Sequence, residues 1–316
     1  MNTLSKIKDM LLAARDIAVY CHTNPDGDTL ACALALRRAL AAKGKTVTVF
    51  CDDKVPERYA FFEGAELVSL PEKRTHELAI AVDCSDLARV GGAGKSFLSA
   101  KKRAVIDHHK SHIAFGDADC VREDAAACAE IVFELLRDAD MLDDGVAALL
   151  FGGIVADTGC FQYPSTTART HEIASELMKF DFDSSDIIYR IHRKIRPEVF
   201  ALKYRALSGC KFFDGGKIAV ITFRLADFEA TNTQPADTEG IVTAAINIAG
   251  VEVAFAVSEV KDKNFKVSIR TKDAADAADI ADAFGGGGHK NAAGCRLSGF
   301  YEDVVDKLLK AARDRM

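Results

Sequence analysis

Four apolar runs of strand length, separated by helical patterns, constrain the fold of this chain more than any other feature of its first half. The segments 30–40, 124–138 and 145–156 carry apolar residues at helical spacing. Strands that alternate with helices form a mainly parallel sheet covered by helices. We therefore expect an α/β fold, whose N-terminal domain is a parallel sheet with helices on both faces. The four runs are residues 17–21, 46–50, 78–82 and 103–106.

Acidic residues directly follow two of these runs. Asp83 comes after 78–82, and Asp107 comes after 103–106. In parallel sheets, ligands bind at the carboxyl ends of the strands. The sequence therefore predicts a polar site at this edge of the sheet.

The composition is that of an ordinary globular protein, with 49% hydrophobic and 28% charged residues. It excludes a disordered chain and a coiled coil. The chain has no apolar run of about 18 residues, the length that a membrane helix needs. The first 14 residues are amphipathic and charged, without the apolar core of a secretion signal. A net charge of −6 argues against a protein that coats long nucleic acid.

The nine cysteines are widely spaced, and no CxxC pair occurs. This pattern argues against a disulfide framework and against a thiolate zinc site. Most of the cysteines lie in apolar stretches, where a thiol serves as a small buried hydrophobe. We therefore expect a cytoplasmic protein.

The chain divides into two domains. The polar segment DFDSSD at 181–186 precedes a basic helical stretch that Pro197 interrupts. Strand and helix patterns then resume, with strands at 217–223, 251–259 and 265–270. We expect a catalytic domain at 1–185, a helical linker at 186–210 and a smaller α/β domain at 211–316.

The segment HTNPDGD at 22–28 follows one predicted strand and precedes a helix. His22, Asp26 and Asp28 lie on a turn and can converge on cations. Imidazole with carboxylate suits Mn2+, Fe2+, Co2+ or Zn2+ better than Ca2+. An Asx-turn in which Asp28 caps the next helix explains the same pattern equally well.

Asp83 follows the predicted strand 78–82, and the Asp107-His108-His109 run follows the predicted strand 103–106. A carboxylate at a strand end can bridge two ions, although it can also cap a helix. Adjacent histidines on an extended segment point in opposite directions. One imidazole could then ligate a metal while the other faces substrate, and Asp107 could orient an imidazole.

Asp157 follows an apolar helix, where a negative charge opposes the helix dipole. That mismatch suggests a nearby cation or hydrogen-bond donor. Together with the earlier segments it gives six candidate ligands for two divalent ions, one carboxylate bridging them. The six are His22, Asp26, Asp28, Asp83, His108 and Asp157. A glycine run at 285–288, followed by His289 and Lys290, is suited to bind a phosphate, although most glycine runs are flexible loops.

The four segments HTNPDGD, VDCSD, IDHH and ADTG resemble, in order and spacing, the four motifs of the DHH phosphoesterase superfamily. GGGGHKNAAG at 285–294 resembles the DHH-associated nucleic-acid-binding domain. The resemblance covers about residues 15–297. Within the superfamily, IDHHKSH, the spacing to AEIV and the segment FQYPSTTART are similar to bacterial nano-RNases that also act as 3′-phosphoadenosine 5′-phosphate phosphatases.

The resemblance implies a role for each motif residue. His22, Asp26 and Asp83 would hold one ion, and Asp28, Asp83, His108 and Asp157 the other. Asp107 would support the histidines, and His109 would face the scissile phosphate. In the second domain a phosphate would be gripped by Arg270 and His289, with the backbone of Gly286, Gly287 and Gly288. The implied cofactors are two Mn2+ ions, for which Mg2+ or Co2+ could substitute.

The chain departs from the usual pattern at three places. Ala31-Cys32 stands where a Gly-Ser pair is usual, His112 where Asn is common, and Thr271 where Ser is frequent. We expect the first to alter helix packing and the others to alter fine substrate preference, leaving the metal ligands intact.

The expected activity is hydrolysis of short oligoribonucleotides, of 3′-phosphoadenosine 5′-phosphate, or of both, by a hydroxide that two metal ions activate. Short RNA or nucleotide phosphate esters would be the partners, with no membrane and with a homodimer as one expected assembly. The alternatives are a phosphodiesterase of cyclic di-AMP or of its linear dinucleotide product, a pyrophosphatase, and a non-catalytic nucleotide-binding module. The glycine run argues against the pyrophosphatase.

Overall fold

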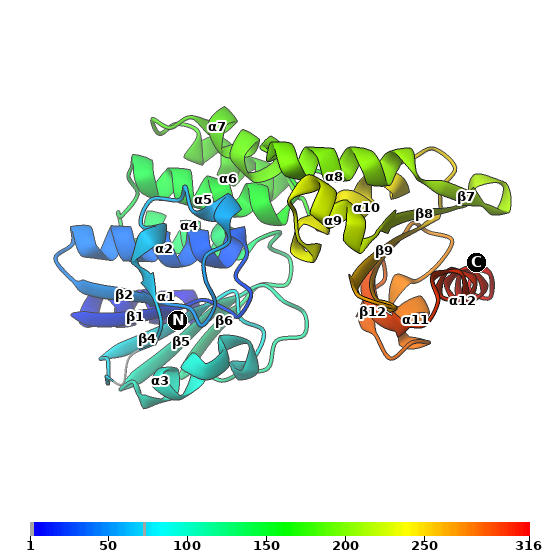
Figure 1. Cartoon of the computed structure of the whole chain (residues 1–316). Helices are drawn as coiled ribbons and strands as arrows, with labels where there is room; N and C mark the ends of the chain where they lie inside the picture. Colours follow the sequence, from blue (N-terminus) through cyan, green and yellow to red (C-terminus); the bar gives the residue numbers. More distant parts are fainter. Residues whose placement is uncertain (1–2, 72–73) are drawn as a thin grey trace. The chain divides into compact units, whose positions relative to one another are not determined.

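The computed structural model describes residues 3–71 and 74–316, so the first two residues of the amphipathic N-terminal segment lie outside the described part. The chain forms two compact units, Met1–Lys194 and Ile195–Met316 (Figure 1). The division falls within the segment 186–210 that the sequence predicts as a linker.

The first unit is built on a six-stranded parallel sheet, which confirms the predicted α/β architecture. Its strand order is β3-β2-β1-β4-β5-β6, so that β1, β4 and β5 are neighbours. The residues of these three strands are mostly apolar because both faces of the sheet are covered. The strands are β1 (Asp16–Tyr20), β2 (Thr46–Phe50), β3 (Val68–Ser69), β4 (Leu78–Val82), β5 (Lys102–Asp107) and β6 (Ala118–Val121).

Helices pack on both faces of this sheet (Figure 1). One face is covered by the helices α1, α2, α4, α5 and α6, and the other by the 3-10 segment η3 with α3. The helices are α1 (Thr3–Ala13), α2 (Gly27–Ala42), α3 (Gly94–Ser99), α4 (Cys128–Arg137), α5 (Asp144–Asp157), α6 (Ala168–Leu177) and α7 (Ser184–Ile188). Shorter turns are η1 (Glu57–Tyr59), η2 (Ala65–Leu67), η3 (Leu87–Ala93) and the π-helix η4 (Tyr189–Arg193).

Two elements of this unit differ from the sequence expectation. The strand β6 carries Asp119 at its centre and alternates between buried and half-buried residues, so it has no apolar run to reveal it. The helix predicted from residue 124 begins at Cys128 instead. In the turn that precedes this helix, the carbonyl of Ala125 contacts His108 of the site described below.

The second unit is a mixed sheet with the order β11-β12-β10-β9-β8-β7. β8 and β9 are parallel, and the other neighbouring pairs are antiparallel. The strands are β7 (Lys211–Phe213), β8 (Ile218–Phe223), β9 (Val253–Lys261), β10 (Asn264–Thr271), β11 (Gly287–His289) and β12 (Ala292–Ser298).

The two faces of this second sheet carry separate apolar clusters. The helices α11 and α12 pack on one face, while α8, α9 and α10 cover β8 and β9 on the other. The helices are α8 (Pro197–Ser208), α9 (Leu225–Thr231), α10 (Ile241–Ile246), α11 (Ala277–Asp282) and α12 (Tyr301–Arg313), with the 3-10 turns η5 (Asp214–Gly216) and η6 (Pro235–Thr238). Pro197 is the first residue of α8, a position where its missing N–H costs no helical hydrogen bond.

Candidate metal centre

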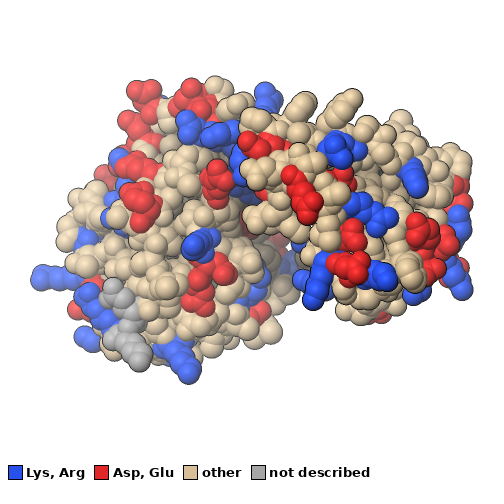
Figure 2. Space-filling view, in the orientation of Figure 1, with Lys and Arg blue, Asp and Glu red and all other residues tan. Residues whose placement is uncertain are grey.

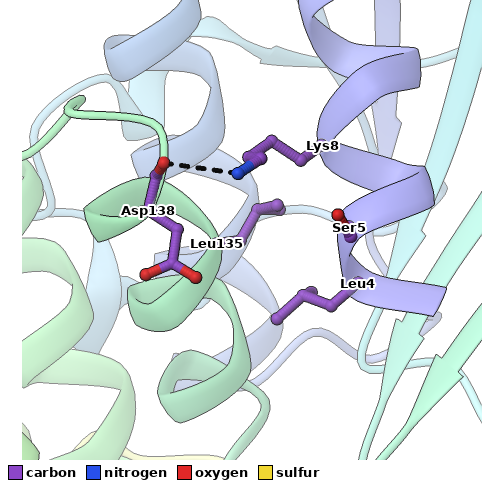
Figure 3. A pocket seen from close by; sticks show the side chains of 5 residues that line it. All are labelled: Leu4, Ser5, Lys8, Leu135 and Asp138. Carbon is purple, nitrogen blue, oxygen red and sulfur yellow. Dashed lines mark hydrogen bonds between the residues drawn. The ribbon is translucent and has the colours of Figure 1, made fainter. Parts of the chain in front are cut away.

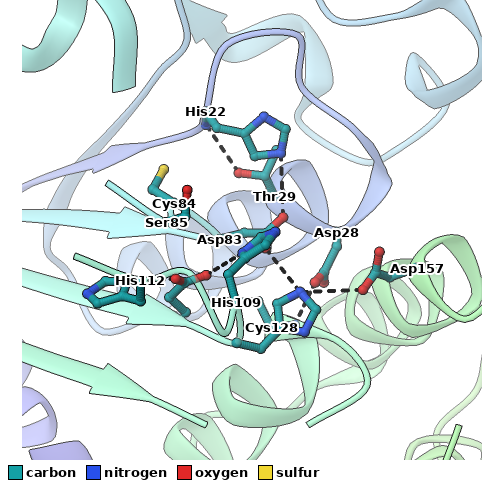
Figure 4. Close-up of polar contacts among 12 residues, drawn as sticks. His22, Asp28, Thr29, Asp83, Cys84, Ser85, His109, His112, Cys128 and Asp157 are labelled. Atoms are coloured by element: carbon teal, nitrogen blue, oxygen red, sulfur yellow. Dashed lines mark hydrogen bonds and ion pairs between the residues drawn. The ribbon is translucent and has the colours of Figure 1, made fainter. Parts of the chain in front are cut away.

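The carboxyl ends of three neighbouring strands carry the predicted site residues of the first unit. His22 follows β1, Asp83 follows β4, and Asp107 is the last residue of β5. Asp157 arrives from the end of α5, which packs closely on α2. Parallel strands end at one edge of the sheet, so side chains that follow them come close together. Figure 4 shows His22, Asp83 and Asp157 around this point.

Asp83 lies at the centre of this group with 3% of its side chain exposed. Its Oδ1 is buried and makes no hydrogen bond. That oxygen faces Nε2 of His108 at 3.4 Å, and Oδ2 faces Nε2 of His22 at 3.5 Å. Burial opposes the charged carboxylate, but the two imidazoles outweigh it and hold the pKa of Asp83 well below its usual range. A buried, charged oxygen without a hydrogen bond is an exception in proteins and a natural ligand for a cation.

The backbone at Asp83 is also unusual. Its φ of 58° lies in the left-handed region, which a residue with a Cβ rarely adopts. The amide of Asp83 is held by a hydrogen bond to the carbonyl of Ile106 at 2.8 Å. Such conformations cluster at functional sites, where the surrounding structure maintains them.

His22, Asp26 and Asp83 form the first group of potential ligands, with one donor atom from each within 4.8 Å of the others. The Nε2 atom of His22 lies 3.6 Å from Asp26 Oδ2, while its Nδ1 lies 2.8 Å from the carbonyl of Thr23. Burial opposes a charge on His22, but the contacts with Asp26 and Asp83 outweigh it and raise the pKa of the imidazole to about 10. The negative charge that retains this proton would equally attract a metal ion.

Asp26, not Asp28, caps the helix α2. Its Oδ1 accepts hydrogen bonds from the amides of Asp28 and Thr29 at 3.0 and 3.2 Å, which leaves Oδ2 toward His22. The sequence-based alternative of a capping aspartate is thus correct for the turn but assigned to the wrong residue. One carboxylate can fulfil both functions because it has two oxygens.

Asp28, His108 and Asp157 form the second group. His108 Nε2 lies 3.5 Å from Asp157 Oδ2, and its Nδ1 lies 3.1 Å from the carbonyl of Ala125. Burial is the main cause that raises the pKa of Asp157 to about 7; His108 lowers it and Asp83 raises it. Burial and the neighbouring Asp83 also raise the pKa of Asp28 well above its usual value. Carboxylates crowded in this way resist ionisation unless a cation accompanies them.

The two groups share no residue, but a third set within the same distance limit links them, because it joins Asp83 of the first group to His108 of the second, together with His109. The six sequence-predicted ligands therefore lie together, three in each group, and the donor set of imidazoles and carboxylates fits Mn2+ or a similar divalent ion. The buried Oδ1 of Asp83 supplies an independent sign of that fit. Each of these adjacent groups offers three donor atoms within 4.8 Å of one another, a set that could hold a metal ion.

His108 and His109 do not point in opposite directions as the sequence suggested. Their ring centroids are 4.8 Å apart, and Nδ1 of His109 lies 3.6 Å from the same Asp83 oxygen that His108 faces. The alternation rule fails because β5 ends at Asp107, so the two histidines lie beyond the strand. Asp107 supports His109, whereas the backbone carbonyl of Ala125 orients His108.

Asp107 is fully buried and links His109 to a longer chain of hydrogen bonds. Its Oδ1 pairs with Nδ1 of His109 and its Oδ2 with Nδ1 of His112, both at 2.7 Å. The other nitrogen of His112 lies 3.2 Å from Asp119 Oδ2. Burial opposes the charge on Asp107, but the two imidazoles outweigh it and lower its pKa; the bond to Asp107 raises the pKa of His109.

Sequence reasoning connected His112 only with fine substrate preference and missed Asp119 altogether. Asp119 accepts hydrogen bonds from the amides of Phe115 and Gly116, so its carboxylate is fixed by the loop that precedes β6. The available signal was an aspartate in the middle of an otherwise apolar segment.

In the second unit, the register brings Arg270 and His289 to one face of the sheet. Both residues pair with Ala292 of β12, one from each side, and paired residues of antiparallel strands point to the same face. The Lys290–Asn291 turn is tied to the end of β10, where Thr271 donates to the carbonyl of Lys290 at 2.8 Å. The glycine run is therefore part of an ordered hairpin.

Two of the glycines are required by close packing. A Cβ at Gly286 would lie 2.3 Å from the carbonyl oxygen of Gly294, and one at Gly288 would lie 2.5 Å from that of Ala292. Gly288 also has a φ of 153°, which favours glycine. A Cβ at Gly287 would meet nothing within 4 Å, so its backbone faces open space.

The face that carries Arg270 and His289 is basic. Phe265, Val267 and Ile269 of β10 point toward α11 and α12, so the residues between them point the other way. There Lys266 lies directly opposite Arg296 of β12, and both are exposed. Like charges in this arrangement are destabilising unless an anion lies near them.

Two cavities of the first unit lie near α1, and neither is lined by a candidate metal ligand. One of about 150 Å³ lies between α1 and α4, lined by Leu4, Ser5, Lys8, Leu135 and Asp138 (Figure 3). A neighbouring one of about 410 Å³ includes Leu4, Asp119 and Asp138 in its lining. On the face shown in Figure 2, acidic and basic side chains are intermingled, in keeping with the mildly acidic composition.

Comparison with known proteins agrees with this geometry. Residues 16–154 match the DHH family, N-terminal domain, and residues 215–316 match the DHHA1 domain. The chain thus contains a DHH domain and a DHHA1 domain. The DHH match contains His22, Asp83 and His108, and Asp157 lies three residues beyond its end. The DHHA1 match contains Arg270 and the glycine run.

Curated relatives align with this chain over most of its length. It is 29% identical over 307 residues to the bifunctional oligoribonuclease and PAP phosphatase NrnA of Thermus thermophilus, covering 95% of this chain and 90% of that protein. It is 25% identical over 298 residues to the Bacillus subtilis protein of the same name, covering 93% and 92%. These relatives are hydrolases by name.

A solved structure shares the fold. The crystal structure of an exopolyphosphatase-related protein from Bacteroides fragilis matches with a TM-score of 0.90 at 23% identity, covering 99% of this chain and 96% of that one. Among the described residues, no helix is both long enough and apolar enough to cross a membrane.

Proposed function

We propose that this chain is a metal-dependent phosphoesterase that hydrolyses short oligoribonucleotides and 3′-phosphoadenosine 5′-phosphate. The observation that carries the proposal is the pair of three-donor groups that Asp83 and His108 link through a third set. The names of the Thermus thermophilus and Bacillus subtilis relatives supply the substrate class. The free thiols of all nine cysteines suit a cytoplasmic enzyme.

His22, Asp26 and Asp83 would hold one divalent ion, and Asp28, Asp83, His108 and Asp157 the other. Mn2+ is the ion that we propose, with Mg2+ or Co2+ as substitutes, because its chemistry suits mixed imidazole and carboxylate donors. When bound, such ions supply charge neutralisation for the phosphate and acidify a water molecule.

His109 would act on the substrate phosphate itself. Its ring is 42% exposed, unlike that of His22, which is 3% exposed. The Nδ1 proton is engaged by Asp107, so Nε2 is the atom left to donate a proton to the leaving oxygen. The raised pKa of His109 keeps that donor protonated over a wider pH range.

The DHHA1 domain would hold a substrate phosphate. Arg270 and His289 lie on one face of its sheet, where a guanidinium can bind two phosphate oxygens. The exposed backbone at Gly287, between the tightly packed Gly286 and Gly288, would add amide donors.

A substrate panel tests the proposal. Di- to penta-ribonucleotides, 3′-phosphoadenosine 5′-phosphate, cyclic di-AMP, its linear dinucleotide and pyrophosphate are each incubated with Mn2+ or Mg2+. We expect turnover of the short RNAs and of the adenosine bisphosphate, and its loss on addition of EDTA. Preferred turnover of cyclic di-AMP or of pyrophosphate would contradict the proposed substrate class, and EDTA-resistant nucleotide binding without turnover would indicate a binding module.

Asp83→Asn is the decisive variant, because it keeps the shape of the side chain and removes the shared charge. We expect it to lose Mn2+ binding, measured by calorimetry, together with activity. Asp138→Asn, at the exposed end of α4, is the matched control and should behave as the unaltered protein. Activity of Asp83→Asn at the unaltered rate would refute the two-cation centre.

A further inference from the structure

Arg89 lies beside the metal centre on a backbone that is fixed from two sides. It belongs to η3, which Asp86 caps by accepting a hydrogen bond from the Arg89 amide at 3.1 Å. The carbonyl of Arg89 accepts a hydrogen bond from the amide of Thr23 at 2.8 Å. The residue is thereby held between the segment after β4 and the segment after β1, both of which carry proposed ligands.

The guanidinium of Arg89 reaches His22. Its Nη2 lies 3.2 Å from Nδ1 of the imidazole, and the same nitrogen lies 2.8 Å from the carbonyl of Thr23. A carbonyl oxygen can only accept a hydrogen bond, so the shorter contact requires a proton on Nδ1. A guanidinium can only donate. The contact of Arg89 with His22 is therefore not a hydrogen bond, and this guanidinium group finds no acceptor there.

Among the described residues, no carboxylate supplies an ion pair for this guanidinium either. Among residues 3–71 and 74–316, Arg89 forms no ion pair, although Arg38, Arg103 and Arg169 of the same unit each pair with an acidic side chain. The side chain is exposed at the rim of the site. An exposed guanidinium beside a candidate cation site is well placed to bind an anion, and phosphate matches its forked geometry.

We propose that Arg89 binds a non-bridging oxygen of the phosphate group that is presented to the metal centre. The inference rests on the proposed phosphoesterase function and adds a substrate contact from the DHH domain, distinct from Arg270 and His289. The backbone of Arg89 is fixed on both sides. A change of side-chain rotamer would therefore be enough for the guanidinium to leave His22 and contact the phosphate.

The test compares Arg89→Ala and Arg89→Lys with Arg137→Ala, a control at the far end of α4. Two substrates are used: a diribonucleotide with a 5′ phosphate, and thymidine 5′-p-nitrophenyl phosphate, whose single phosphate must occupy the metal centre. Binding of inorganic phosphate and of Mn2+ is measured separately by calorimetry.

Arg89→Ala should lower kcat/KM roughly 10- to 100-fold on both substrates, as expected for loss of a charge-assisted hydrogen bond. Its affinity for inorganic phosphate should fall by a similar factor, while Mn2+ affinity stays within about twofold, since Arg89 is not a ligand. Arg89→Lys should be intermediate because it keeps the charge and loses the fork. Arg137→Ala should match the unaltered protein.

An unchanged kcat/KM, or a loss confined to the diribonucleotide, would overturn the proposal; the second result would assign Arg89 to another phosphate. Failure of the proposed phosphoesterase function would give a different experimental result. The unaltered protein would then turn over neither substrate, and the comparison of inorganic phosphate affinity between it and Arg89→Ala would still decide the role of Arg89.

Discussion

Asp28 caps a helix that begins 100 residues later in the chain. Its Oδ2 accepts a hydrogen bond from the amide of Cys128 at 2.6 Å, and its Oδ1 accepts one from the amide of Ala129 at 3.0 Å. Ala127, the residue that precedes α4, has no side chain able to cap it. The carboxylate of Asp28 thus replaces the missing cap while it lies within the second group of potential ligands.

Because Asp28 both caps α4 and belongs to the second group of potential ligands, two substitutions of this residue should have different effects. Asp28→Ala leaves two buried amides unsatisfied, and we expect the metal-free protein to lose about 1–2 kcal/mol of unfolding free energy. Asp28→Asn keeps one oxygen for the helix and removes a charge that Asp83 and Asp157 repel. It should therefore be more stable than Asp28→Ala when metal-free. Both should lose Mn2+ affinity; urea unfolding and calorimetry measure the two effects, and equal stability of the two variants would contradict the capping role.

Gly153 allows the close approach of three helices at the same point. A Cβ there would lie 2.9 Å from both Asp28 Oδ1 and the Cβ of Ala129. We expect Gly153→Ala to cost about 1–3 kcal/mol of unfolding free energy through overpacking, and to weaken Mn2+ binding by displacing Asp28. Gly209→Ala is the control, because a Cβ there would meet atoms no closer than 3.6 Å. Normal Mn2+ affinity in a folded Gly153→Ala protein would refute the link between packing and ligation.

The Asp107–His109 hydrogen bond gives a pH prediction. Asp107 raises the pKa of His109, so the protonated imidazole survives to higher pH than it otherwise would. Asp107→Asn removes the charge; the pKa of His109 then falls, and the descending basic limb of the kcat/KM profile should move to lower pH. We also expect activity to fall roughly 10- to 100-fold, as for other groups that orient catalytic histidines.

Asp119→Asn tests how far this chain of hydrogen bonds extends. Because Asp119 contacts His112 and not His109, its substitution should shift the basic limb in the same direction but less than Asp107→Asn. An unmoved basic limb in Asp107→Asn would exclude His109 as the proton donor.

The opposed Lys266 and Arg296 predict a dependence on substrate length. Both lie on the face that carries Arg270 and His289, where they can contact the phosphates of a longer RNA. In the double variant Lys266→Gln with Arg296→Gln, KM for a pentaribonucleotide should rise, and the slope of log affinity against log salt should fall by about 1. Hydrolysis of 3′-phosphoadenosine 5′-phosphate, which lacks the extra phosphates, should be unchanged. Equal effects on both substrates would contradict this assignment.

Local sequence accounts for much of the fold and for the composition of the site. The apolar runs that precede Asp83 and Asp107 identify two buried strands, and the position of each aspartate at a strand end follows from the parallel architecture. The strand β6 could not be predicted this way, because Asp119 interrupts its pattern and its neighbour β5 determines its pairing. The orientation of His108 and His109 was predicted wrongly, since the exact end of β5 decides it.

The sequence by itself determined which residue types follow each strand, and so which side chains were available as ligands. Only the tertiary structure decided the contacts around the site: that Asp28 caps α4, that Ala125 orients His108, and that the guanidinium of Arg89 lies beside His22. The physical reason is that strand and helix preferences act over a few neighbouring residues, whereas these contacts join segments from 17 to 100 residues apart. Their distances are set by the packing of whole helices and strands against one another, which no single segment encodes.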